Sequence, residues 1–117
     1  MIAQQEVLDV KVLQRLVRDI GLDNTLKFMD SLDNEFQKRI DNIQAALAEK
    51  SFAGLTAEAH ALKSSAQISG AFRLAEILVD IEVLAKEKNS EVFSLAREAI
   101  DSADLTRFAF LDVKFDQ

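Results

Sequence analysis

The chain has 117 residues, no cysteine, no proline and three glycines, and its formal net charge at pH 7 is −6. This length suits one domain with its own hydrophobic core, and the absence of cysteine excludes disulfides and thiolate metal sites and fits a reducing cytoplasm. The acidic charge disfavours nucleic acid as a partner, no apolar run approaches the roughly 20 residues of a membrane span, and the first ten residues lack the basic start of a signal peptide.

Helix-favouring residues predict an all-α fold, because Ala, Leu, Glu, Lys and Gln are abundant and proline is absent. A first helix is expected over about residues 10–20, with Asp9 as its N-cap and Gly21 as its left-handed stop. A second helix is expected to begin after residues 23–24 and to reach about residue 50. Its apolar residues recur at helical spacing and predict one buried stripe, made of Leu26, Met29, Phe36, Ile40, Ile43 and Leu47.

A third helix is expected from Ser51, a suitable N-cap, to about Ser69. Gly70 most simply ends it by supplying a positive φ for the turn. The buried stripe of this helix advances by three and four residues and comprises Phe52, Leu55, Ala59, Leu62 and Ala66.

Two further helices are expected, over about residues 71–88 and, after a cap at residues 89–90, through the following segment. The predicted inward residues of the fourth helix are Leu74, Ile77 or Leu78, Ile81 and Leu84. Those of the fifth are Val92, Leu95, Ala99 and Ala103. In the stretch 105–115 the spacing of Phe108, Leu111 and Phe115 would continue a helical stripe, and the last few residues are expected to fray.

Short connections between long amphipathic helices imply antiparallel neighbours. We therefore expect residues 1–117 to form a single domain, an antiparallel four-helix bundle with a short additional N-terminal helix. A bundle of this kind closes with one chain, so we expect a monomer.

His60 is the only histidine, and its neutral imidazole is the one good nitrogen nucleophile near neutral pH. Each helical residue turns about 100°, which places His60 roughly 135° from the centre of the buried stripe and Ser64 almost opposite that stripe. Lys63 and Gln67 flank the same face at i+3 and i+7. His60 is therefore expected on the solvent side of the bundle.

A lone exposed histidine on a helix is more often a solvated surface residue than a functional one. Its neighbours favour function here, because Ser64 and Ala61 are small and leave the ring open to another protein. Lys63 is placed to neutralise a phosphoryl group or an acidic side chain. Gln67 is able to hydrogen-bond the ring or a phosphoryl oxygen, although a polar residue on a wet face needs no such role.

The segment His60-Ala61-Leu62-Lys63-Ser64-Ser65 is followed by Gly70-Ala71, Leu74-Ala75 and Ile81-Glu82. This set resembles the histidine phosphotransfer (HPt) domains of multistep phosphorelays, whose signature is His-x-Leu-Lys-Gly-Ser, then Gly-Ala, Leu-Ala and a hydrophobic-Glu pair. The stretch 19–23 also looks like the first turn of that family, so the resemblance covers most of the chain.

By this resemblance His60 is the phosphorylated residue, Lys63 stabilises the phosphoryl group, Ser64 is the small residue beside the ring, and Gly70 turns the third helix into the fourth. The position after the lysine is usually glycine in the family and is Ser64 here, whose hydroxyl is able to bond the phosphoryl group. The frequent cysteine of the fourth helix is replaced by Leu78.

The resemblance implies a phosphocarrier that takes a phosphoryl group from one receiver-domain aspartate and passes it to another. The expected partners are the receiver domains of a hybrid sensor kinase and of a response regulator. No glycine-rich phosphate loop is present, so ATP binding and autophosphorylation are not expected. No cofactor is expected on this chain, and the Mg²⁺ of the transfer is expected on the receiver, while His60 supplies the attacking nitrogen.

Two other classes of function compete with this interpretation. A helical adaptor that binds a kinase or receiver without carrying phosphate would have the same composition. A metal or haem binder is disfavoured, because the one histidine faces outward and no cysteine or inward Glu-x-x-His pair accompanies it.

Overall fold

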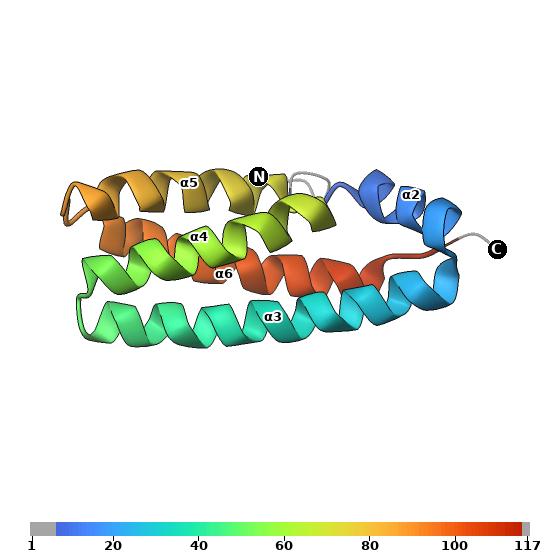
Figure 1. The fold of residues 1–117 in the computed structure, drawn as a ribbon, viewed down its shortest axis with the longest axis horizontal. Helices are drawn as coiled ribbons and strands as arrows, with labels where there is room; N and C mark the ends of the chain where they lie inside the picture. The colour runs from blue at the N-terminus through green and yellow to red at the C-terminus, as the bar shows by residue number, and fades with distance from the viewer. Residues whose placement is uncertain (1–6, 116–117) are drawn as a thin grey trace.

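The protein is described here by a computed structural model of residues 7–115. Its helices are α2 (Val10–Ile20), α3 (Leu22–Ala48), α4 (Phe52–Ser69), α5 (Phe72–Lys86) and α6 (Val92–Asp112), and the described residues contain no strand. In the bundle, α3 and α5 each pack against both α4 and α6, and α2 covers one end by packing on α3 and α4 (Figure 1). This confirms the predicted antiparallel four-helix bundle with an additional N-terminal helix. None of the helices in the described range is long and apolar enough to cross a membrane.

Side-chain caps begin two helices at the predicted residues. The Asp9 carboxylate accepts a hydrogen bond from the Lys11 N–H at 3.1 Å, and the Ser51 hydroxyl accepts one from the Gly54 N–H at 2.9 Å. Each cap satisfies an N–H that has no partner within its own helix. The start of α3 differs from the prediction, because the Asn24 amide donates to the last carbonyl of α2 at 2.8 Å and the new helix begins at once after Gly21.

Gly70 makes the turn between α4 and α5 and needs to be glycine for two reasons. Its φ of +87° is left-handed, and a Cβ there would lie 2.7 Å from the Asp9 carbonyl oxygen. The Ala71 N–H donates to the Ala66 carbonyl at 2.8 Å, which closes the end of α4. The Asp9 N–H donates to the Gly70 carbonyl at 2.9 Å, so this turn is also tied to the start of α2.

Two helices end earlier than predicted, because lysines take the left-handed closing position that glycine usually occupies. The last residues of α3 and α5 are Ala48 and Lys86, while Lys50 has a φ of 51° and Lys88 a φ of 55°. In both turns the following N–H reaches back to the carbonyl five residues earlier, at 2.9 Å. Each helix thus ends two residues before the approximate end predicted for it, because such a closure does not require glycine.

The core follows the predicted stripes except near the end of the bundle beside α2. Both Ile77 and Leu78 are buried, so the two alternatives for α5 both face inward. The predicted inward positions Leu26, Phe108 and Leu111 are wrong, since these side chains are 44%, 67% and 81% exposed. The core there is instead filled by other side chains of α3 and α6, namely Thr25, Leu32, Thr106, Ala109 and Phe110. The Phe110 ring packs against the Phe36 ring in a tilted arrangement with centroids 5.7 Å apart, a contact that favours the observed rotation of α6.

Candidate functional site

His60 projects from the middle of α4 into solvent, with 73% of its side chain exposed. The opposite face of the same helix is almost fully buried and contains Leu55, Ala59, Leu62 and Ala66. Burial of these four residues sets the rotation of α4 and thereby the outward direction of the imidazole. The ring is accessible to a protein partner without any rearrangement of the core.

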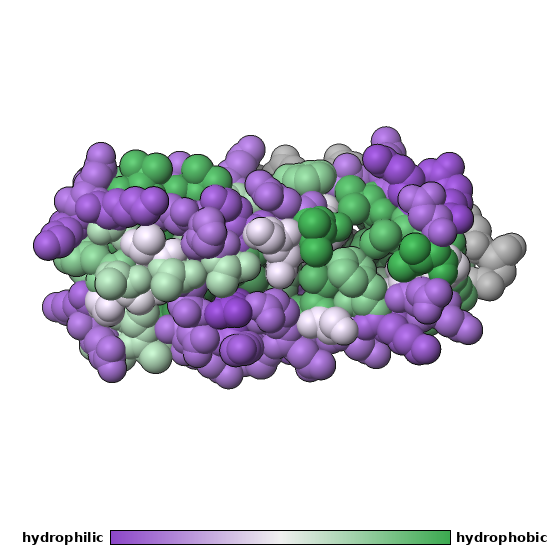
Figure 2. Space-filling view, viewed as in Figure 1, coloured by the Kyte–Doolittle hydropathy of each residue, from purple (hydrophilic) through white to green (hydrophobic). Residues whose placement is uncertain are grey.

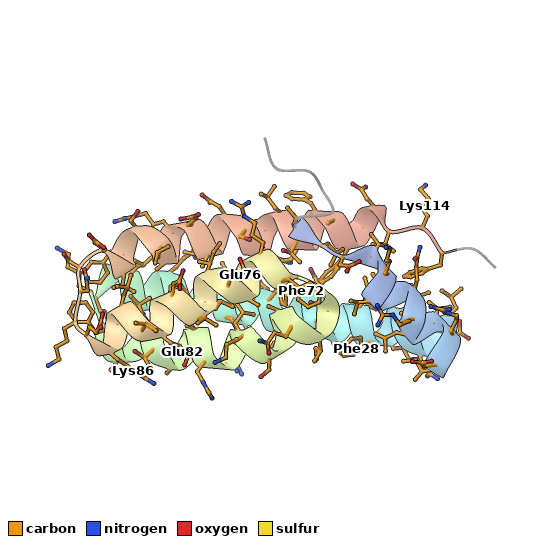
Figure 3. All side chains as sticks on the ribbon, turned by 90° about the horizontal axis from the view of Figure 1, so that it is seen from above. Phe28, Phe72, Glu76, Glu82, Lys86 and Lys114 are labelled. Atoms are coloured by element: carbon orange, nitrogen blue, oxygen red, sulfur yellow. The ribbon has the colours of Figure 1, made fainter. Side chains whose placement is uncertain are left out.

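A carboxylate from the neighbouring helix holds one side of the ring. Glu82 of α5 places Oε2 3.3 Å from His60 Nδ1, although the two residues are 22 positions apart in the sequence. Figure 3 shows Glu82 on the part of α5 that borders α4. Only 12% of this side chain is exposed, so the carboxylate lies between the two helices and the imidazole lies at the surface.

The ionisation of Glu82 is set mainly by Lys63. A hydrogen bond from Lys63 lowers the pKa of Glu82, burial opposes it, and the contact with His60 lowers the pKa further. The net pKa lies below the usual range, so the carboxylate is charged at neutral pH.

The charged carboxylate determines which ring nitrogen is free. An ionised carboxylate only accepts hydrogen bonds, so the Nδ1 that faces Glu82 carries the proton. In a neutral ring the lone pair then resides on Nε2, the nitrogen away from Glu82. The site therefore presents an oriented imidazole whose nucleophilic nitrogen is the one that does not face Glu82.

Lys63 lies one helical turn after His60 and is bound to the same carboxylate. Its Nζ is 2.8 Å from Glu82 Oε1, and 26% of its side chain is exposed. Lys63 is thus on the expected side of α4 beside His60 but is only partly exposed, because its ammonium is paired with the Glu82 carboxylate. The ammonium, the carboxylate and the imidazole form one connected group across α4 and α5.

Ser64 and Gln67 are both exposed on the face of α4 that carries His60. Within residues 7–115 no hydrogen bond joins Gln67 to the ring or to Lys63. Ser64 follows His60 by one turn, and its short side chain leaves the approach to the ring open. The structure therefore brings His60 and Lys63 together through Glu82, and it leaves the other two predicted residues as surface neighbours.

A second polar cluster ties the opposite edge of α4 to α3. Glu58 accepts hydrogen bonds from Arg39 Nη1 at 2.9 Å and from Asn42 Nδ2 at 3.0 Å, and Arg39 Nε also donates to Glu35 at 2.6 Å. Burial raises the pKa of Glu58, but the hydrogen bonds from Asn42 and Arg39 outweigh it and lower the pKa overall. Polar contacts thus hold α4 to α3 along one edge and to α5 along the other. Together with the buried apolar face of α4, they fix the direction in which His60 points.

Glu82 and Glu58 have structural roles at the site that sequence reasoning missed. Glu82 belongs to the hydrophobic-Glu pair that follows the histidine motif, so the sequence pattern marked this residue, but the sequence alone gave it no role. No corresponding signal marks Glu58, since its partners are on α3. Among residues 7–115, no group of three or more His, Cys, Asp or Glu side chains is arranged to hold a metal ion.

Comparison with known proteins identifies one relationship. Residues 27–107 match the family model described as the Hpt domain, which covers the whole site and most of the bundle. Comparisons with curated proteins and with solved structures gave no match.

Proposed function

The chain belongs to the Hpt domain family, whose role is histidine phosphotransfer in phosphorelays, and we propose that His60 is the residue that receives and releases the phosphoryl group. The donor and the acceptor are receiver-domain aspartates, one in a hybrid sensor kinase and one in a response regulator. The exchange takes place in the cytoplasm, with this chain as a monomer. The observation that carries the proposal is the exposed ring of His60 with Nδ1 turned toward the charged Glu82.

The transfer needs little from this chain beyond an oriented nucleophile. The Nε2 lone pair attacks phosphorus, the N–P bond forms, and the P–O bond to the receiver aspartate breaks to release its carboxylate. The product ring keeps its proton on Nδ1 and bears a positive charge, which the Glu82 carboxylate offsets. The same steps in reverse transfer the group to the second receiver, and each receiver supplies the Mg²⁺.

Lys63 has an electrostatic role in this proposal. Its ammonium neutralises part of the charge on the phosphoryl oxygens and also keeps Glu82 ionised. Ser64 keeps the approach to the ring open and offers a hydroxyl to the phosphoryl group. Gln67 lies farther along the same exposed face and offers an amide for the same purpose.

Receivers dock on an apolar surface next to the ring. Ile68, 53% exposed, continues the face of His60 and Ser64, and Phe72 at the start of α5 is 46% exposed. Figure 2 shows hydrophobic side chains gathered near the C-terminal end of α4, between α2 and α3. A receiver surface with an apolar centre fits this patch.

The principal test is incubation with a phosphorylated receiver domain. We expect an acid-labile, alkali-stable label on the wild-type chain and none on His60→Gln, whose folding is checked by circular dichroism and urea unfolding. Because the chain has a single histidine, a phosphohistidine signal is assigned without mapping. Persistent labelling of His60→Gln contradicts the proposal, and full signalling output from an unlabelled His60→Gln supports the adaptor alternative.

The docking surface is tested separately with a matched pair of variants. Ile68→Ser removes an apolar side chain from the proposed surface and is expected to weaken receiver binding about tenfold, the effect of losing an interface hot spot. Leu105→Ser is the control, because Leu105 of α6 is equally exposed, at 50% against 53%. Equal receiver affinities for both variants would exclude this surface.

A further inference from the structure

A second apolar surface lies between the N-terminal half of α3 and the C-terminal half of α6, two segments that run side by side at the α2 end of the bundle (Figure 1). Two adjoining hollows occupy this groove, with volumes of about 240 and 300 Å³, and both are lined by Asp33, Arg107 and Leu111. Buried Met29 and Phe110 also line the larger hollow. We call this surface the α3/α6 groove.

The two most exposed large hydrophobic side chains of the described residues, and a third exposed leucine, line the α3/α6 groove. Leu111 is 81% exposed and Phe108 is 67% exposed, and Leu26 on the opposite side is 44% exposed. None of the three is needed to fill the bundle, because Ala109 and Phe110 occupy the core at this level. Apolar side chains that gather beside a hollow without a structural role mark an interaction surface.

The charge around the groove is acidic. Residues 22–33 and 101–112 together contain six aspartates against two basic residues, Lys27 and Arg107. Arg107 is already bound, since its Nε lies 2.7 Å from Asp33 Oδ1 and its Nη2 lies 3.2 Å from Asp33 Oδ2. Asp30 and Asp104 are exposed at the edges, so the groove offers negative charge to a partner.

We propose that the α3/α6 groove binds an amphipathic helix of a partner protein, with an apolar stripe against Leu26, Phe108 and Leu111 and with Lys or Arg toward Asp30 and Asp104. Two adjoining hollows between a pair of helices suit apolar side chains repeated at helical spacing. A second copy of this chain is the poorer occupant, because it would bring two acidic edges together at a net charge of −6 per chain.

The groove and the His60 face are separate surfaces. Figure 3 shows α4 and α6 on opposite sides of α5, so His60 remains open when a helix occupies the groove. A partner held in this way raises the effective concentration of any receiver domain linked to it. Occupation of the groove thus adds affinity without contact at the reacting nitrogen.

The test uses two synthetic helical peptides that share one leucine stripe at i, i+3, i+4 and i+7. One carries lysine on its other positions and the second carries glutamate. Titration of the isotope-labelled full chain, followed by NMR, is expected to show saturable binding of the lysine peptide, with the largest shifts in residues 26–33 and 104–115. We expect affinity to fall about tenfold in Phe108→Ser, as for loss of an interface anchor. The fall in Asp104→Asn is expected to be smaller, about two- to fivefold, as for loss of an exposed ion pair.

Val83→Ser is the matched control, since Val83 is 51% exposed on α5 and lies outside the groove. Equal binding of the two peptides, shifts outside the groove, or no loss in Phe108→Ser would overturn the proposal. Concentration-dependent dimerisation that Phe108→Ser abolishes would assign the groove to a second copy and also overturn it. The measurements need no phosphate, so they stand apart from the transfer test on His60.

Discussion

The pair formed by Lys63 and Glu82 provides the sharpest test of the site, because its two atoms are only 2.8 Å apart and its carboxylate is largely buried. Exposed ion pairs contribute about 0.2–1 kcal/mol, whereas hydrogen bonds to charged groups contribute about 1.5–3 kcal/mol. Exposures of 26% for Lys63 and 12% for Glu82 place this pair between the two cases. We expect Lys63→Met to lower the free energy of unfolding by about 1.5 kcal/mol at pH 7.

The coupling between the two residues is measured with a double-mutant cycle. Lys63→Met, Glu82→Gln and the double variant are unfolded in urea beside the wild type, and the expected interaction energy is about 1 kcal/mol. Lys86→Met replaces an exposed lysine of α5 and serves as the control, with an expected change within about 0.5 kcal/mol. A coupling energy near zero would refute the proposed pairing of Lys63 with Glu82.

The pH dependence of the same variants follows from the lowered pKa of Glu82. A carboxyl whose pKa is lower in the folded chain stabilises the fold above its unfolded pKa, and this stabilisation is lost as the pH falls through the folded value. The difference between wild type and Lys63→Met should therefore be greatest near neutral pH and shrink below about pH 4, the ordinary range of a glutamate. A difference that grows in acid would contradict this assignment.

Three further predictions concern the transfer rate and the turns. Lys63→Ala should slow transfer to His60 about tenfold without abolishing it, because the lost contribution is electrostatic, and unchanged single-turnover rates would contradict that role. Gly70→Ala should lower the free energy of unfolding by about 2 kcal/mol or more, since it adds left-handed strain and a clash with the Asp9 carbonyl. A melting temperature within about 2 °C of the wild-type value would refute this reasoning, because that is roughly half the shift expected for a single kcal/mol. Lys88→Gly should raise the free energy of unfolding by about 0.5–1 kcal/mol by relieving a left-handed φ of 55°, and a fall in urea midpoint would show that another contact outweighs that strain.

The helices could be predicted from the sequence because their signals are local. Apolar spacing sets the inward face of a helix, and the caps at Asp9, Ser51 and Gly70 act through hydrogen bonds over a few residues. The failures occurred where local signals compete. Several apolar residues lie next to one another around Phe110, so more than one face of α6 could have turned inward. In the structure the buried face is the one that brings Phe110 into contact with Phe36.

The sequence by itself determined that His60 faces solvent, because the rotation of a helix follows from which of its own residues are apolar. Only the tertiary structure decided that Glu82 meets both His60 and Lys63, since that contact depends on the relative rotation and axial position of α4 and α5. The same holds for the α3/α6 groove, whose two walls are more than 70 residues apart, as the contact between Asp33 and Arg107 shows. Local chemistry orients a side chain on its helix, whereas packing between helices selects the partners that it meets.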